Sequence, residues 1–231
     1  MLTLEGVEIR RPGFALAADL AIENGARVSV LGPSGAGKST LLSAIAGFLL
    51  PDAGRVAFDG RDLAPLPPGR RPVSMIFQDG NLFPHLTAFE NAALGLRLSG
   101  RLTREERDRV ARSLDRVGLE GLGDRKPGAL SGGQQGRVAL ARILLRAQPV
   151  MLLDEPFAAL GPALKRRMLA LVDEVATEIG ATVLMVSHDP QDARRLGGQT
   201  VFVAGGRAHA PAPTAHLLDQ PPPALRTYLE G

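Results

Sequence analysis

Cysteine is missing from this 231-residue sequence. Its absence excludes disulfide bonds and thiolate metal sites, and it suits a reducing cytosol. The first residues, Met1–Glu5, contain neither a basic segment nor an apolar one, so no signal peptide is expected. The most apolar stretch, Val138–Leu153, is interrupted by Arg142, Arg146 and Gln148 and is too short to cross a bilayer. A role at a membrane would therefore need another chain to span it.

The sequence also has little excess charge of either sign. Its formal net charge is +3, which is too small to indicate a nucleic-acid partner, and no nucleic acid is expected. Hydrophobic residues make up 45% of the chain, enough for a substantial core. The length fits one large α/β domain, or a core domain with an inserted subdomain.

Strand and helix patterns alternate along much of the chain. Residues 2–31 are β-rich, and the strand 27–31 leads through a glycine-rich loop into a helix. Further apolar strands are expected at 73–77, 150–153, 182–186 and 200–204, and a helix is expected from about Pro162. Such alternation predicts a mostly parallel sheet with helices on its faces.

Residues 82–130 interrupt the alternation and have a helical, amphipathic pattern. Thr103 and Glu106 have the spacing of a helix capping box, and Val110 and Leu114 lie on one face of the helix that follows. We expect this segment to belong to an inserted helical subdomain. The residues between Asp219 and Pro223 are expected to form an extended linker.

The glycine-rich loop matches the pattern G-x-x-x-x-G-K-[ST]. It reads Gly32, Pro33, Ser34, Gly35, Ala36, Gly37, Lys38, Ser39 and is followed by Thr40. Glycines let backbone N–H groups face phosphate oxygens, and the start of a helix adds partial positive charge. Lys38 is expected to reach the β- and γ-phosphates, Ser39 to hold Mg²⁺ and Thr40 to contact the α-phosphate. The alternative, a plain glycine turn, does not explain why strand, loop, lysine and helix occur in this order.

Two acids end the apolar strand 150–153. A buried strand that delivers a carboxylate beside a phosphate loop is typical of a Mg²⁺ ligand, and Asp154 is expected to take that role through water. Glu155 is expected to orient or deprotonate the attacking water. Taken alone, the pair could equally be acids in a solvated turn; the phosphate loop favours the functional interpretation.

A second glycine-containing helix start reads Leu130, Ser131, Gly132, Gly133, Gln134. At this point the chain resembles the ATP-binding-cassette (ABC) ATPases, whose signature is LSGGQ. Serine and two glycines at a helix start form a second phosphate-facing N-terminus, which one nucleotide does not need from the same chain. The resemblance implies that it belongs to a second copy, so that two ATP molecules lie between the subunits of a head-to-tail dimer.

The resemblance covers essentially the whole chain and implies a fold. It implies an α/β P-loop NTPase core with a mostly parallel sheet, an N-terminal antiparallel β subdomain and an inserted helical subdomain. The core would comprise residues 1–81 and 149–231, and the helical subdomain, with the signature, residues 82–148. Gln78 is similar to the family's glutamine that touches Mg²⁺ or the attacking water, and His188 to the histidine that contacts the γ-phosphate. A lone glutamine or histidine is usually an ordinary polar residue at a strand end.

Within the family, the chain most resembles the ATP subunits of bacterial thiamine importers, through residues 70–78, 81–83, 85–87 and 184–188. This implies an ATPase that powers import of thiamine or thiamine phosphates from the cytoplasmic face of the inner membrane. Its partners would be transmembrane permease subunits, docked on Gln78 and Asp79–Thr87, and indirectly a periplasmic solute-binding protein. The alternatives are an importer for a metal, sulfate or polyamine, a soluble ABC ATPase, and a binding module with degraded catalysis.

Three positions depart from the family pattern. The family's adenine-stacking aromatic is replaced by the stretch Arg10–Phe14, in which Arg11 or Phe14 could stack on the base, and weak selectivity for ATP over GTP is expected. Gly161 replaces an aspartate that crosses the dimer, so coupling between the two sites is expected to be weak. Gly136 lies inside a helix, at a cost of about 1 kcal/mol relative to alanine.

Overall fold

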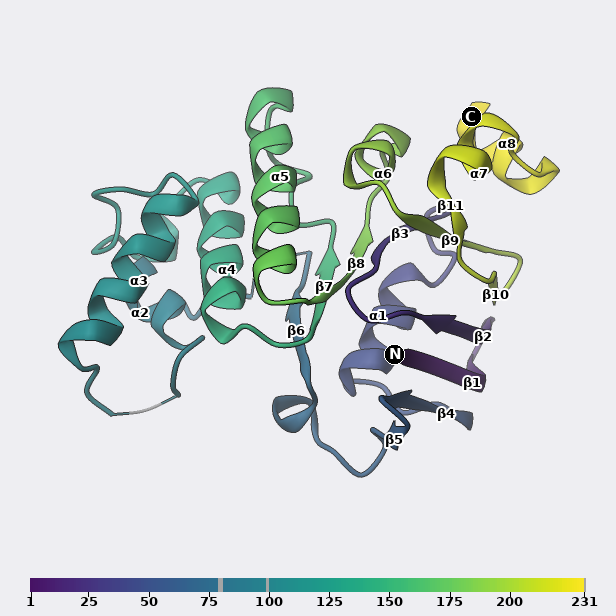
Figure 1. Ribbon diagram of the computed structural model, residues 1–231, viewed down its shortest axis with the longest axis horizontal. Coiled ribbons are helices and arrows are strands. Elements are labelled where there is room, and N and C mark those ends of the chain that lie inside the picture. Colours follow the sequence, from purple (N-terminus) through teal and green to yellow (C-terminus); the bar gives the residue numbers. More distant parts are fainter. Residues whose placement is uncertain (79–80, 99, 231) are drawn as a thin grey trace.

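The computed structural model describes residues 1–78, 81–98 and 100–230. Within them, 11 strands form one curled sheet with helices around it (Figure 1). The strands are β1 (Leu2–Arg11), β2 (Phe14–Ile22), β3 (Arg27–Leu31), β4 (Ala53–Phe58), β5 (Arg61–Asp62), β6 (Val73–Ile76), β7 (Val150–Asp154), β8 (Thr182–Val186), β9 (Gln199–Ala204), β10 (Arg207–Ala208) and β11 (Ala212–Pro213). The helices are α1 (Lys38–Ala46), α2 (Ala88–Ala93), α3 (Arg104–Arg116), α4 (Gly132–Arg146), α5 (Pro162–Glu178), α6 (Pro190–Leu196), α7 (Thr214–Asp219) and α8 (Pro223–Glu230).

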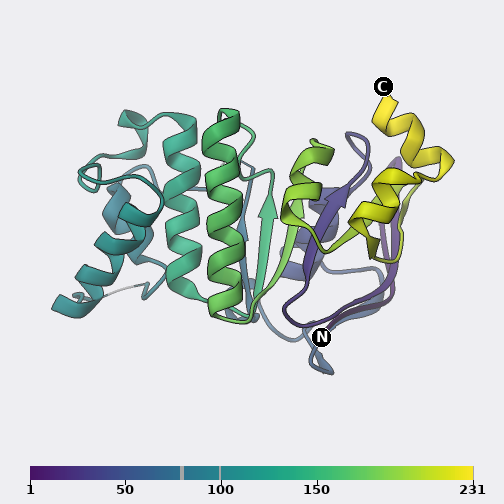
Figure 2. The ribbon, with the colours of Figure 1, turned by 45° about the horizontal axis from the view of Figure 1, so that its top comes forward.

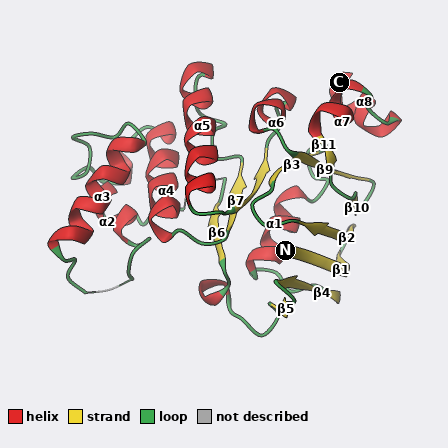
Figure 3. Ribbon diagram, in the orientation of Figure 1, coloured by secondary structure: helices red, strands yellow, loops and turns green. Residues whose placement is uncertain are grey.

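The sheet has a parallel part and an antiparallel part. Its order is β5-β4-β1-β2-β10-β9-β3-β8-β7-β6, and β11 pairs with β9. The strands β9, β3, β8, β7 and β6 run parallel, whereas β5, β4, β1 and β2 pair in antiparallel fashion (Figure 3). The short β10 joins the two parts. The predicted parallel core and N-terminal antiparallel subdomain are therefore confirmed.

Helix α1 is enclosed between the two parts of the sheet. Its apolar side chains share one core cluster with inward-facing residues of β1, β2 and β4 and with residues of β3, β7 and β8. Successive side chains of a strand point to opposite faces, so Val150 and Leu152 of β7 face this cluster. Their neighbours Met151 and Leu153 face a second cluster on the other side of the sheet.

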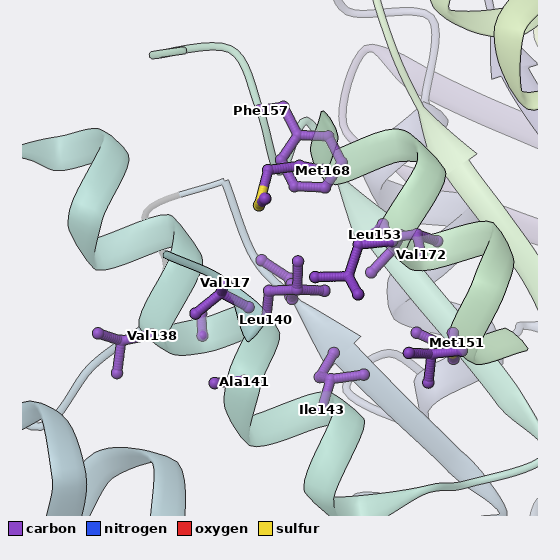
Figure 4. Close-up of a cluster of buried hydrophobic side chains, with 14 of the residues drawn as sticks. Val117, Val138, Leu140, Ala141, Ile143, Met151, Leu153, Phe157, Met168 and Val172 are labelled. Atoms are coloured by element: carbon purple, nitrogen blue, oxygen red, sulfur yellow. The ribbon is translucent and has the colours of Figure 1, made fainter. Parts of the chain in front are cut away.

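The second cluster joins α4 and α5 to the sheet. Leu140 and Ile143 of α4 pack with Met168 and Val172 of α5 around Leu153 of β7 (Figure 4). Helices α2 and α3 pack on the far side of α4, where Val110 and Leu114 are buried. The inserted helices therefore form a layered block that extends beyond β6, the last strand of the sheet (Figure 1).

A third, smaller cluster lies beside β3 and β9. Leu31 and Phe202 pack there against Ala193 of α6, Leu218 of α7 and Leu225 of α8. Figure 2 shows these three helices gathered at the C-terminal end of the chain. The expected linker is wrong in part, since Asp219 ends α7 and Pro223 begins α8. Helices of six to eight residues are marginal alone, and here each is held by the burial of a leucine. Across the described ranges, no helix combines the length and apolarity needed to cross a membrane.

Candidate nucleotide site

The glycine-rich loop connects β3 to α1 in a backbone conformation that depends on glycine. Gly32 has φ 152°, and a Cβ there would lie 2.1 Å from the Val203 carbonyl oxygen. Gly37, the N-cap of α1, has φ 104°, and a Cβ there would lie 2.8 Å from the Phe14 ring. Side chains at these two positions would force the loop away from its neighbours. The loop is thus packed in one conformation, with the N-terminus of α1 directly behind it.

Lys38, the first residue of α1, folds back over the loop. Its Nζ donates hydrogen bonds to the carbonyl oxygens of Gly32 (2.7 Å) and Pro33 (2.8 Å). Burial lowers the pKa of the Lys38 ammonium, while the nearby Glu155 and Asp154 carboxylates oppose that shift. The arrangement holds a positive charge at a helix N-terminus, where an anion is favoured.

Ser39 and Asp154 form an oxygen pair beside the loop. The Ser39 hydroxyl donates to Asp154 Oδ1 at 3.1 Å, and the Asp154 side chain is buried at the end of β7. Burial raises the pKa of the Asp154 carboxyl, and the Ser39 hydrogen bond partly offsets this. Hydroxyl and carboxylate oxygens suit Mg²⁺, which usually takes one or two protein ligands and completes its shell with water and phosphate.

Glu155 and His188 meet at the ends of neighbouring parallel strands. The His188 Nε2 atom pairs with Glu155 Oε1, and the Glu155 amide donates to the Val186 carbonyl oxygen at 3.2 Å. Glu155 has a left-handed backbone, with φ 48°, which is unfavourable for a residue with a side chain and is often found at functional sites. Its side chain is only 11% exposed, whereas that of His188 is 51% exposed.

One cavity brings most of the predicted site residues together. It is lined by Phe14, Ser34, Gly35, Gly37, Lys38, Ser39, Thr40, Gln78, Glu155 and His188. Asp154 reaches this cavity through its hydrogen bond to Ser39. Gly32, Pro33 and Ala36 shape the loop, through the two carbonyl groups that hold Lys38 and a hydrogen bond from the Ala36 amide to the Pro33 carbonyl oxygen.

The signature residues lie elsewhere. Ser131 caps α4 and forms a capping box with Gln134, in which each side chain accepts a hydrogen bond from the other's backbone amide. Gly132 and Gly133 line a neighbouring cavity, whereas none of the four residues 131–134 lines the cavity that contains Lys38. Within the described part of one chain, the two phosphate-facing helix starts therefore do not share a cavity.

The three departures have structural explanations or consequences. Arg11 is engaged by the Asp52 carboxylate at 3.1 Å, while Phe14 lines the nucleotide cavity, so Phe14 is the aromatic available there. A Cβ at Gly136 would lie 3.2 Å from the Pro156 carbonyl oxygen, so this glycine allows α4 to approach the segment after Glu155 closely. Gly161 is the N-cap of α5 and has open space around it.

Sequence reasoning missed a buried polar network behind His188. Asp192 of α6 is 2% exposed; its Oδ2 accepts a hydrogen bond from Ser187 Oγ and pairs with Lys165 Nζ of α5, each at 2.6 Å. The Ser187 hydroxyl in turn accepts a hydrogen bond from the Asp189 amide at 3.1 Å. The dipeptide Asp189-Pro190 is a helix-start signal that could have revealed α6. The network fixes the loop that carries His188 to two helices.

The loop, the strand-end carboxylates and the parallel core together define a P-loop ATPase. A family model described as ABC transporter matches residues 17–158, more than half of the sequence. The chain therefore belongs to the ABC transporter family, and it binds and hydrolyses ATP.

Relatives and solved structures agree with this assignment. A protein named Thiamine import ATP-binding protein from Cereibacter sphaeroides is 63% identical over 229 residues, covering 99% of both chains. A protein of the same name from Ruegeria sp. is 57% identical with the same coverage. The structure is also similar to a dimeric ATP-binding cassette solved in a post-hydrolysis state with ADP and Pi. That match has a TM-score of 0.82 and 32% identity, and it covers 93% of this chain and 99% of the other.

Proposed function

We propose that this chain is the ATP-hydrolysing subunit of an ABC importer for thiamine or thiamine phosphates. The observation that carries the motor function is the single cavity in which Lys38, Glu155 and His188 meet from three different segments. The cargo is supported by the names of relatives that are 57% to 63% identical over 99% of this chain. Since the ATPase does not itself touch the solute, only the assembled importer can test the cargo.

Each residue of the cavity has a role in this proposal. The loop amides and Lys38 bind the phosphates, and Glu155 orients or deprotonates the attacking water. His188 leaves the Glu155 carboxylate to contact the γ-phosphate. Gln78 lines both the nucleotide cavity and the neighbouring cavity that Gly132 and Gly133 line. Ser39 and Asp154, with Gln78, would hold Mg²⁺, which supplies charge neutralisation of the phosphates when bound.

We further propose that the catalytic unit is a head-to-tail pair of this chain. Ser131 and the signature glycines do not line the nucleotide cavity of their own chain, which leaves them available to a second copy. The similar solved structure is described as dimeric and bound to ADP and Pi, which supports this arrangement. In the pair, residues 82–148 act as the helical subdomain that carries the signature toward the partner's ATP.

A groove between the core and the inserted helices is the proposed docking site for the permease. It has a volume of about 270 Å³ and is lined by apolar side chains that include Phe48, Phe77, Phe83 and Leu98, with Arg142 and Arg146 on α4. Phe48, Phe83 and Leu98 are 56%, 48% and 81% exposed, and such a cluster is typical of a protein interface. Of the predicted docking segment Asp79–Thr87, residues 79 and 80 lie outside the described residues.

In this proposal the chain, docked to the permease through this groove, lies peripherally at the cytoplasmic face of the cell membrane, with the periplasmic solute-binding protein as an indirect partner. Leu98→Asp should abolish co-purification with the permease while leaving the melting temperature of the isolated chain unchanged. Leu50→Asp is the matched control, since Leu50 is also exposed (58%) but does not line the groove. Equal co-purification of both variants would contradict the proposed docking site.

Catalysis is tested with Glu155→Gln in the assembled importer. The variant should bind Mg·ATP as tightly as the original chain but turn it over about 100-fold or more slowly, because the group that activates water is lost. Glu120→Gln, at an exposed surface position, should have no effect. Normal turnover in Glu155→Gln would remove Glu155 from the mechanism.

The cargo is tested separately. ATP turnover by the reconstituted importer should rise when its solute-binding protein carries thiamine. Sulfate, polyamine or a divalent metal should give no increase. Stimulation by one of these solutes and not by thiamine would leave the ATPase function in place but show that the importer carries a different solute.

A further inference from the structure

Helix α8 reaches back to the loop that carries the catalytic histidine. The Tyr228 hydroxyl donates a hydrogen bond to the His188 carbonyl oxygen at 3.2 Å, across 40 positions of sequence. Tyr228 is the only tyrosine in the chain. Nothing in the glycine loop, the signature or the strand-end acids predicts this contact, because it depends on how a short helix packs.

The position of Tyr228 is fixed by the packing of α8 on the cluster beside β3 and β9. On the same helix, Leu225 is fully buried in the cluster beside β3 and β9. The ring of Tyr228 lies with its centroid 6.3 Å from that of Phe202, which belongs to the same cluster. The hydroxyl is therefore presented to His188 by a packed helix and not by a free surface side chain.

The phenol lies within the electrostatic reach of the catalytic centre. Burial raises the pKa of Tyr228, and the Glu155 and Asp189 carboxylates raise it further. Hydrogen bonding by the Gly32 backbone, at the start of the glycine loop, acts in the opposite direction. The Tyr228 hydroxyl thus contacts the histidine loop, and its pKa depends on the charge of the catalytic carboxylate.

His188 is held at two points that have different consequences. Its imidazole pairs with Glu155, a contact that has to break before the ring can reach a γ-phosphate. Its backbone carbonyl is held by Tyr228, and the Asp189 amide is held by Ser187. Because the backbone is anchored independently of the ring, the ring is free to change partners while the loop stays in place.

We propose that Tyr228 is a positioning residue for ATP hydrolysis, whose hydroxyl fixes the His188 backbone so that the imidazole turns from Glu155 to the γ-phosphate without movement of the loop. The proposal rests on the proposed function, which assigns His188 to the γ-phosphate. It makes α8 a point of control: displacement of this helix slows hydrolysis and leaves ATP binding intact.

The kinetic test compares Tyr228→Phe with Thr227→Val in the assembled importer. Phenylalanine keeps the ring against Phe202 and removes only the hydroxyl, while Thr227 is an exposed neighbour on the same helix. We expect Tyr228→Phe to lower kcat by about three- to tenfold, the range that loss of one neutral hydrogen bond allows, with an unchanged KM for ATP and an unchanged Tm. Thr227→Val should match the original chain. An unchanged kcat in Tyr228→Phe, or an equal fall in Thr227→Val, overturns the proposal.

A spectroscopic test uses the fact that tyrosine occurs once. Tyrosine labelled with carbon-13 at Cζ gives one resonance, whose pH titration reports the phenol pKa. Glu155→Gln should lower that pKa, because the Glu155 charge is removed, whereas Glu120→Gln should leave it unchanged. An identical phenol pKa in both variants overturns the placement of Tyr228 at the catalytic centre.

The proposed function and the proposed role of Tyr228 would be contradicted by different results. Absence of Mg·ATP turnover in the original chain would refute the proposed function. Failure of the role of Tyr228 would instead appear as normal turnover in both the original chain and Tyr228→Phe.

Discussion

Gly161 combines a departure from the family pattern with open space around its Cα. It has φ −65° and ψ 157° at the N-cap of α5, a conformation that aspartate adopts readily, and nothing lies within 4 Å of an added Cβ. An aspartate there would accept a hydrogen bond from a backbone N–H group in the first turn of α5. Its negative charge would also be attracted to the partial positive charge at the start of the helix.

Gly161→Asp should therefore raise the free energy of unfolding by about 0.5 kcal/mol, measured by urea denaturation. It should also raise the Hill coefficient for ATP hydrolysis, because it restores a carboxylate at the position that crosses the dimer in the family. Gly161→Ala, which has no acceptor, should show neither gain. A gain in Gly161→Ala equal to that in Gly161→Asp would contradict the capping explanation.

The most readily predicted residues of the site are those that a contiguous motif places. Gly32–Thr40 and the acids at 154–155 can be predicted because their spacing, with a strand before each, is itself the physical requirement. The sequence alone does not distinguish Phe14 from Arg11 as the group that stacks on the base, because only the ion pair with Asp52 shows where Arg11 lies. The contacts of Lys165 with Asp192, and of Tyr228 with His188, join distant segments and leave no local pattern.

Helices α3 and α4 begin with the same device and thereby offer a matched comparison. Thr103 caps α3 and Ser131 caps α4, and both form complete capping boxes. Thr103→Ala and Ser131→Ala should each lower the free energy of unfolding by about 1 kcal/mol, measured by urea denaturation. Only Ser131→Ala should also lower ATP turnover, by about tenfold or more, because Ser131 is proposed to contact the partner's phosphate. Equal turnover in the two variants would restrict Ser131 to capping.

The capping box of α3 also predicts a pH dependence. The Thr103 amide donates to Glu106 at 2.7 Å, and this hydrogen bond, with the Arg97 ion pair, lowers the Glu106 pKa below its ordinary value of 4.5. Since the folded pKa lies below the unfolded one, the stabilisation is complete above pH 4.5 and is lost as the pH falls through the folded pKa. Glu106→Gln should therefore flatten the stability profile in that acidic range, measured by urea denaturation at a series of pH values. A slope unchanged from the original chain would show that Glu106 contributes no pH-dependent stability.

Strands were easier to predict than short helices. The bounds of β3 and β8 agree with those expected, because buried parallel strands are short apolar runs between polar turns. Helices α6, α7 and α8 were not expected, since segments of six to eight residues have too little periodicity to register. Their stability comes from Ala193, Leu218 and Leu225 packing on a sheet face, which is tertiary information.

The complete ATPase is proposed to need two copies, and this can be tested by mixing two inactive variants. Lys38→Met disables the phosphate loop, and Ser131→Arg blocks the signature. In a head-to-tail pair of one of each, one site combines both defects and the other contains neither. An equimolar mixture should therefore recover up to about a quarter of the original turnover, since half the dimers are mixed and each has one intact site.

The same mixture separates alternative assemblies. If each chain used its own signature, every site would retain one defect and no turnover would return. Turnover of the separate variants, measured at the same total concentration, is the control. An inactive mixture would contradict the head-to-tail arrangement.

The enclosure of α1 between the two parts of the sheet has a mechanical consequence. A helix packed against strands on both sides resists tilting. We therefore expect the residues proposed to bind the triphosphate to stay fixed during the ATPase cycle. The block of α2, α3 and α4 projects past the last strand, so it is the part expected to move relative to the fixed core (Figure 1). We therefore expect movement driven by ATP to pass through this helical block, which forms one side of the groove where Phe48 and Phe83 are exposed.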